Sequence, residues 1–73
     1  MIELRSTNTA QSRRKAIRKR AAALQGGYSA GDKWLNTPAM ALNGRSPNSV
    51  LRQPGGIALV EELLGRLEHG VYT

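Results

Sequence analysis

The stretch GIALVEELLGRLEHG, residues 56–70, decides the fold. Its apolar residues recur at alternating steps of three and four, which is the spacing of one face of an α-helix. Gly70 follows the last residue of the pattern, at a position where a left-handed backbone conformation costs glycine least. The spacing therefore predicts a helix over residues 56–69 with one buried face. The apolar series, which runs just past the predicted helix, is Ile57, Val60, Leu64, Leu67 and Val71.

A glycine interrupts the middle of this predicted helix. Gly65 costs about 1 kcal/mol relative to alanine inside a helix. Its position predicts that another helix approaches closely there, either from the same chain or from a second copy. Self-association across Gly65 is therefore one hypothesis for what the chain does.

Shorter elements precede the long helix. Ser29 and Asp32 resemble a capping box, which predicts a short helix over about 30–36. Asn43–Gly44 predicts a turn with positive φ. Ser46–Pro47 reads as the N-cap and first residue of a further helix, which must end before Pro54.

No segment alternates with a period of two, so we expect an all-α protein, a small bundle of short helices with a longer C-terminal helix. We expect its core to be formed by Trp34, Leu35, Leu42, Val50, Leu51, Ile57, Val60, Leu64 and Leu67.

The positive charge of the chain lies near its start. Residues 1–20 hold seven basic residues against one glutamate, whereas residues 21–73 hold four of each sign. Ser12 is a candidate cap for a basic helix over 12–25, which Gly26–Gly27 would end. We therefore expect two regions, a partly disordered basic arm or helix over 1–27 and a neutral domain over 28–73.

Composition argues against several classes of function. The chain has no cysteine and a single histidine, and its five carboxylates are scattered, so no metal site, cofactor site or catalytic group is indicated. His69 stands where a helix C-terminus favours a cation. No stretch reaches the length of a membrane span. We expect a cytoplasmic protein that is not an enzyme.

The basic run offers a nucleic-acid contact. Cations on one helix neutralise phosphates and give binding that depends strongly on salt. Aromatic residues are absent from the run, so a base-stacking platform is not indicated. The competing interpretation is a solvated helix. The candidate residues are Arg13, Arg14, Lys15, Arg18, Lys19 and Arg20.

The C-terminal half as a whole resembles a known family. The string WLNTPAMALNGRSPNSVLRQPGGIALVEELLGRLEHGVYT, residues 34–73, is similar to the C-terminal toxin-binding domain of Xre/MbcA/ParS-type antitoxins. The resemblance extends over about residues 28–73. The residues that carry it, in order, are Trp34, Leu35, Thr37, Pro38, Leu42, Gly44, Pro47, Val50, Leu51, Gly55, Gly56, Val60, Leu64, Arg66, Gly70, Val71 and Tyr72.

The resemblance implies a specific partner and mechanism. Members of that family neutralise RES-type toxins, which consume NAD, and their final residues obstruct the toxin's active-site cleft. It implies an antitoxin of a type II system with no cofactor of its own. The implied toxin-binding residues are Arg66, His69, Gly70, Val71, Tyr72 and Thr73.

Two points stay open. Val71 and Tyr72 could instead fold back on Leu67 as a hydrophobic contact after the helix end. Family members also usually carry an N-terminal helix-turn-helix domain, for which about 27 residues are too few. Operator DNA is therefore a second candidate partner, through the basic run, and we expect a homo- or hetero-oligomer.

Overall fold

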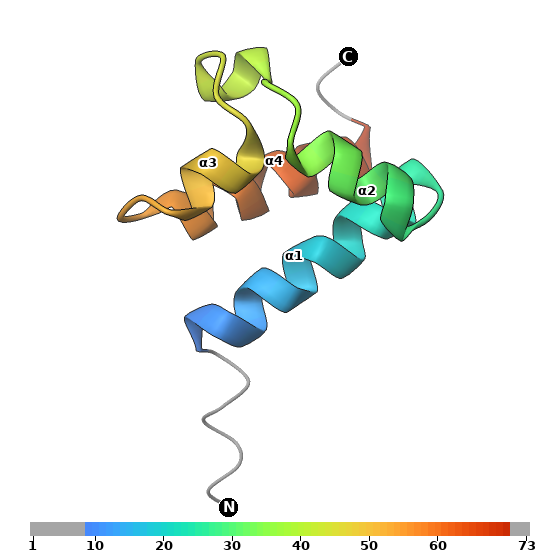
Figure 1. Ribbon diagram of the computed structural model, residues 1–73, viewed down its shortest axis with the longest axis horizontal. Helices are drawn as coiled ribbons and strands as arrows, with labels where there is room; N and C mark the ends of the chain where they lie inside the picture. The colour runs from blue at the N-terminus through green and yellow to red at the C-terminus, as the bar shows by residue number, and fades with distance from the viewer. Residues whose placement is uncertain (1–8, 71–73) are drawn as a thin grey trace, which may run out of the picture.

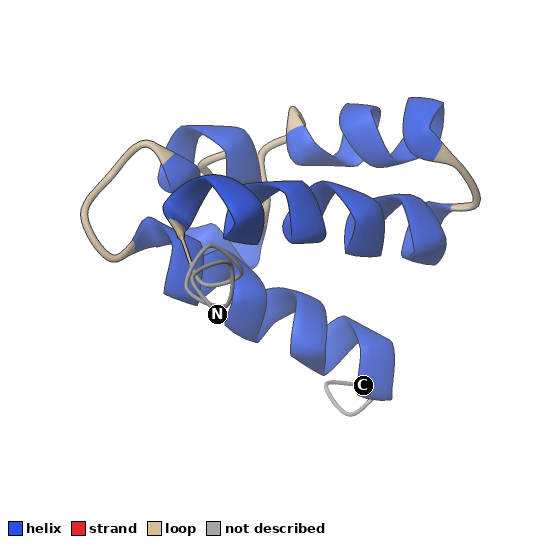
Figure 2. Ribbon diagram, turned by 90° about the horizontal axis from the view of Figure 1, so that it is seen from below, coloured by secondary structure: helices blue, strands red, loops and turns tan. Residues whose placement is uncertain are grey.

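The computed structural model describes residues 9–70. Over this range the chain is helical, with short connecting loops (Figure 1, Figure 2). The elements are α1 (Ala10–Gln25), α2 (Tyr28–Leu35), the 3₁₀-helix η2 (Met40–Leu42), α3 (Pro47–Leu51) and α4 (Gly56–His69). Residues 9–70 contain no β-strand, only one isolated bridge between Ala39 and Arg45. The prediction of an all-α bundle with a longer C-terminal helix is confirmed.

The long helix has the bounds that its sequence predicts. Gly55 precedes α4 with φ 75°, and Gly70 ends it with φ 66° and ψ 22°. The Gly70 N–H donates to the carbonyl oxygens of Arg66 at 3.0 Å and Leu67 at 3.3 Å. These bonds satisfy carbonyl groups of the last turn, which have no partner inside the helix.

The prediction for Gly65 is not met within the described part of the chain. A Cβ added there would meet nothing closer than Nη2 of Arg20, at 4.0 Å. Close backbone approaches occur at two other glycines instead. A Cβ on Gly31 would lie 2.8 Å from the Ala22 nitrogen, and one on Gly56 would lie 1.7 Å from the Val50 oxygen.

Two predicted caps are wrong. Helix α1 begins at Ala10, and its cap is Thr9, whose Oγ1 accepts from the Ser12 N–H at 3.1 Å. Ser12 thus lies inside the helix. Helix α2 begins at Tyr28 after Gly27 and has no side-chain cap. Asp32 does not complete a capping box because its carboxylate accepts hydrogen bonds from an α1 arginine.

The later turns follow their sequence signals. Asn43 and Gly44 both have positive φ, 60° and 81°. Ser46 caps α3 by accepting from the Ser49 N–H at 3.2 Å, and Pro47 is its first residue. Helix α3 ends at Leu51, before Pro54.

One core is shared by all the helices. Among the residues expected there, Leu35, Leu42, Val50, Leu51, Val60 and Leu64 are buried, while Trp34, Ile57 and Leu67 are partly buried against them. Ile17 and Ala21 of α1 and Leu63 of α4 are also buried in this cluster. Helix α1 therefore packs on α2 and α4 as part of the same hydrophobic unit (Figure 1).

Candidate functional site

The C-terminal end of α4 carries three of the predicted toxin-binding residues. Arg66 and His69 lie in its last turn, and both are exposed. Arg66 donates to Glu62 at 3.0 Å, an exposed pair one helical turn apart. Gly70 then redirects the backbone. Val71, Tyr72 and Thr73 lie outside the described residues, and so does any contact of theirs with Leu67.

The basic run on α1 is largely engaged within the chain. Arg13 donates through Nε and Nη2 to both carboxylate oxygens of Glu61 on α4. Arg20 makes the same two-point contact with Glu68, also on α4, with both distances at 2.7 Å.

Arg18 makes the third such contact, this time with α2. Its Nε and Nη2 both lie 2.9 Å from the carboxylate oxygens of Asp32. The same guanidinium lies over the Tyr28 ring, 4.7 Å from its centre. Three forked arginine–carboxylate contacts thus join α1 to the two helices on which it packs.

These contacts shift the titration of the carboxylates. Hydrogen bonds donated by Arg13 hold the pKa of Glu61 below its ordinary value. Arg18 lowers the pKa of Asp32, and Arg20 lowers that of Glu68, in the same way. In each case burial opposes the shift and is the weaker effect. The three carboxylates are therefore ionised at neutral pH.

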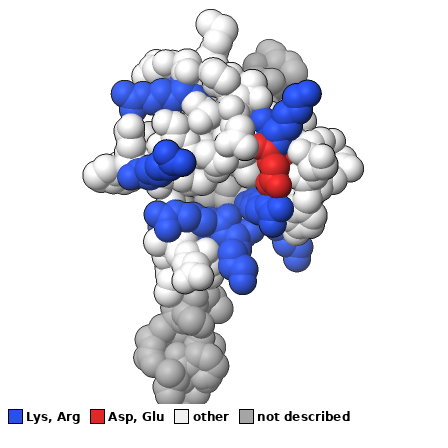
Figure 3. All heavy atoms as spheres, viewed as in Figure 1, with Lys and Arg blue, Asp and Glu red and all other residues white. Residues whose placement is uncertain are grey.

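The remaining cations of the run differ in position. Arg14, Lys15 and Lys19 are exposed and have no ion pair among residues 9–70. Arg14 lines a hollow of about 220 Å³ together with Arg52 from the end of α3. Figure 3 shows Lys and Arg side chains spread over the face that it views, with few Asp or Glu side chains among them. The exposed positive surface is thus built from two separate segments.

An apolar surface lies between η2 and α4, and sequence reasoning missed it as a candidate site. Met40 at the start of η2 is 94% exposed, and Leu59 on α4 is 52% exposed. We call this surface the Met40 face and define it by Trp34, Met40, Ala41, Leu59, Leu63 and Leu67. The only local signal in the sequence is an apolar stretch, residues 39–42, between two turns.

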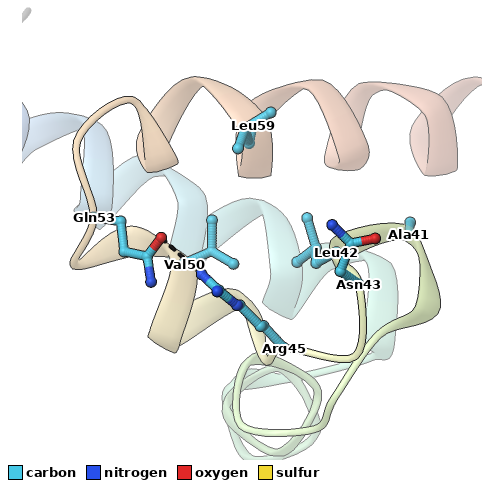
Figure 4. Close-up of a pocket in the computed structure, with 7 residues that line it drawn as sticks. All are labelled: Ala41, Leu42, Asn43, Arg45, Val50, Gln53 and Leu59. Carbon is cyan, nitrogen blue, oxygen red and sulfur yellow. Dashed lines mark hydrogen bonds between the residues drawn. The ribbon is translucent and has the colours of Figure 1, made fainter.

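Three hollows adjoin one another along this face. One, of about 240 Å³, is lined by Trp34 and Met40 and reaches Leu67. Another, of about 270 Å³, lies between Leu59 and the η2 loop (Figure 4). A third, smaller hollow between them includes Arg66 at its edge.

Other classes of site find little support in the described residues. Residues 9–70 contain no group of three or more His, Cys, Asp or Glu side chains placed to hold a metal ion. None of the helices in that range is both long enough and apolar enough to cross a membrane. The features that remain are the end of α4, the Met40 face and the exposed cations.

Comparison with known proteins assigns the domain. The family described as the antitoxin Xre/MbcA/ParS C-terminal toxin-binding domain matches residues 20–70. The chain belongs to this family. The antitoxin domain is accordingly a toxin-binding regulator and not an enzyme. The match starts within α1 and ends at Gly70, so it includes the arginine contacts of Arg20, the Met40 face and all of α4.

A curated relative agrees with this assignment. The antitoxin domain is 48% identical over 40 residues to a protein named Antitoxin Xre from Yersinia enterocolitica serotype O:8 / biotype 1B (strain NCTC 13174 / 8081). That alignment covers 55% of the present chain and 27% of the relative, so the chain matches about a quarter of the relative's length. No solved structure matches the chain significantly.

Proposed function

We propose that this antitoxin domain neutralises a RES-type, NAD-consuming toxin by inserting its C-terminal residues into the toxin's active-site cleft. The observation that carries the proposal is the end of α4: a 14-residue helix that ends on a left-handed Gly70, in a chain of the toxin-binding family. A helix anchored in the core is a stiff support for the residues that follow it. An NAD-consuming toxin acts where NAD is, so the proposal places both proteins in the cytoplasm.

The chemistry of the last residues suits an obstructing segment. Tyr72 combines a large aromatic area with a hydroxyl that can hydrogen-bond, and it has few rotatable bonds to order. Arg66 and His69, exposed in the last turn of α4, stand at the base of this segment.

Removing the last three residues tests the proposal. We expect a chain lacking Val71–Thr73 to lose protection of NAD in a mixture with the toxin, while its helical content and thermal unfolding stay unchanged. The matched control is Thr37→Ala, which leaves the C-terminal segment intact. Full protection of NAD by the shortened chain would show that the terminal residues do not block the toxin.

A second candidate function is contact with operator DNA. It is supported by Arg14, Lys15 and Lys19, which have no ion pair among residues 9–70, and by Arg52 beside Arg14. Arg13, Arg18 and Arg20 are held by carboxylates. The DNA surface proposed here is therefore smaller than the run in the sequence, and it includes a residue from α3.

The salt dependence of DNA binding distinguishes the two surfaces. Each phosphate neutralised contributes about −0.9 to the slope of log K against log salt. Four exposed cations predict a slope of about −3.6, whereas the six of the run would give about −5.4. We expect Arg52→Gln to make the slope less steep and Arg20→Gln to leave it unchanged, in a fluorescence anisotropy titration. An effect of Arg20→Gln alone would contradict this surface.

A further inference from the structure

The Met40 face has the composition of an interaction surface. Methionine and aromatic residues are enriched at the centres of protein interfaces, and charged residues are depleted there. Met40 and Leu59 both leave apolar side chains in water. Arg66 at its edge pairs with Glu62, and Arg45 donates a 2.8 Å hydrogen bond to the side-chain oxygen of Gln53 (Figure 4).

The loop that presents Met40 is held in place by its own backbone. Ala39 N–H donates to the Arg45 oxygen at 3.0 Å, and Gly44 N–H returns to the Ala39 oxygen at 2.9 Å. Asn43 N–H donates to the Met40 oxygen at 3.0 Å. Leu42, which is buried, fixes the loop to the core. These contacts hold Met40 in its exposed position before any partner binds. A preformed loop loses little entropy on binding.

The other surfaces of the antitoxin domain are less suitable for an apolar partner. Helix α1 presents Arg14, Lys15 and Lys19 to solvent. The contact between α1 and α4 is closed by the Arg13–Glu61 and Arg20–Glu68 pairs. Within residues 9–70, large exposed apolar side chains other than those of the Met40 face are limited to Tyr28, which is stacked by Arg18.

We propose that the Met40 face is where the toxin docks on this domain. The inference rests on the proposed function, because it takes the toxin as the partner. It is supported by continuity along α4: Leu59, Leu63 and Leu67 lie on this face, and Leu67 precedes Gly70 by three residues, about 4.5 Å of helix rise. A toxin whose cleft receives the segment after Gly70 therefore lies beside this face. Apolar contact there holds the toxin while the terminal residues obstruct it.

If the Met40 face binds the toxin and the terminal segment inhibits it, the two roles can be measured separately. Most of the affinity comes from the Met40 face and a smaller part from the terminal segment, whereas inhibition requires the terminal segment. A chain without Val71–Thr73 therefore still binds the toxin, more weakly, and a charge placed on the Met40 face weakens both the full and the shortened chain.

The test measures toxin affinity by isothermal titration calorimetry, with a catalytically inactive form of a RES-type toxin. The variants are Met40→Glu and Leu59→Glu, in the full chain and in the chain lacking Val71–Thr73. Ala23→Glu, an exposed position on α1, is the control with the same change of charge. Circular dichroism verifies that each variant is folded, which the exposure of Met40 and Leu59 favours.

We expect each variant of the face to weaken binding at least about tenfold, as substitution of a central interface residue commonly does, and Ala23→Glu to change it less than about twofold. Unchanged affinity of both variants would overturn the inference and leave the proposed function standing. Failure of the unmodified chain to bind the toxin would overturn the proposed function itself.

Two other occupants give different results. If a second copy of the chain covers the face, Met40→Glu changes the sedimentation of the chain alone and leaves toxin affinity intact. If the chain's own terminal residues cover it, Met40→Glu has no effect once Val71–Thr73 are removed. Either result would overturn docking of the toxin on this face.

Discussion

At the scale of single residues, α4 contains two glycines with opposite requirements. The start of α4 passes very close to α3. A Cβ on Gly56 would lie 1.7 Å from the backbone oxygen of Val50 and 2.7 Å from its carbonyl carbon. Backbone atoms cannot move aside as a flexible side chain can. At Gly65, in the middle of the helix, a Cβ would meet only Nη2 of Arg20, at an ordinary contact distance of 4.0 Å, within residues 9–70.

Alanine at these two positions should therefore have effects of opposite sign. We expect Gly56→Ala to lower the free energy of unfolding by about 3 kcal/mol, since inserting atoms into a packed region commonly costs 1–3 kcal/mol or more. Gly65→Ala should raise it by up to about 1 kcal/mol through helix propensity. Urea denaturation of both variants measures the difference. A loss of stability in Gly65→Ala that depends on protein concentration would indicate self-association across that glycine.

At the scale of elements, α1 is an amphipathic helix. Some of its charged side chains face solvent, and others contact α2 and α4. Ile17 and Ala21 face the core, and arginines on either side of them reach carboxylates on α2 and α4. Like charges along one helix repel each other. In this fold each forked contact offsets part of that repulsion, so the tertiary structure stabilises a helix that is unfavourable by itself.

These contacts predict a dependence of stability on pH. The pKa values of Glu61, Asp32 and Glu68 are lower in the folded chain than their ordinary values, 4.5 for glutamate and 3.8 for aspartate. Their contribution is therefore complete above about pH 4.5 and is lost as the pH falls through the lowered pKa values. We expect the midpoint temperature of unfolding, followed by circular dichroism, to decrease as the pH is lowered below 4.5.

A matched variant isolates the cause of that decrease. Glu68→Gln cannot lose a charge in acid, so the decrease between pH 5 and pH 2 should be smaller in this variant than in the unmodified chain. Glu62→Gln is the control, because Glu62 pairs with Arg66 on the same exposed surface of α4 and joins no two helices. Identical acid profiles for all three proteins would show that the contacts between helices do not contribute.

At the scale of the whole molecule, the described residues share one small core. A chain of 73 residues buries only about 60% of the surface that it exposes when unfolded, so each buried side chain is a large part of its stability. Ile17 from α1 and Leu64 from α4 both belong to the core, and they are 1% and 0% exposed. Loss of either affects helices that are distant in the sequence.

Truncation of Ile17 should accordingly destabilise the whole unit. We expect Ile17→Ala to cost about 2–5 kcal/mol and to lower the unfolding midpoint of all helices together. Hydrogen exchange measured by mass spectrometry would then rise in α4 as well as in α1. Leu24→Ala, a partly buried position in the same helix, should cost less. Faster exchange confined to α1 would show that the N-terminal helix unfolds by itself.

The sequence by itself determined what depends on neighbouring residues: the all-α class, the bounds of α4, the turn at Asn43–Gly44 and the Ser46 cap of α3. Such features arise from helix periodicity, capping and backbone preference, which act over a few residues. The resemblance to the antitoxin family was likewise carried by residues in order along the chain, and family comparison confirmed it.

The tertiary structure alone decided what depends on residues far apart in the chain. Arg13 meets Glu61 and Arg20 meets Glu68 across 48 positions, and Arg18 meets Asp32 across 14. Half of the six basic residues of an apparent nucleic-acid surface are thus engaged with carboxylates. The exposure of Met40 likewise depends on how the η2 loop lies against α4. Packing sets these distances, and neither composition nor periodicity contains them.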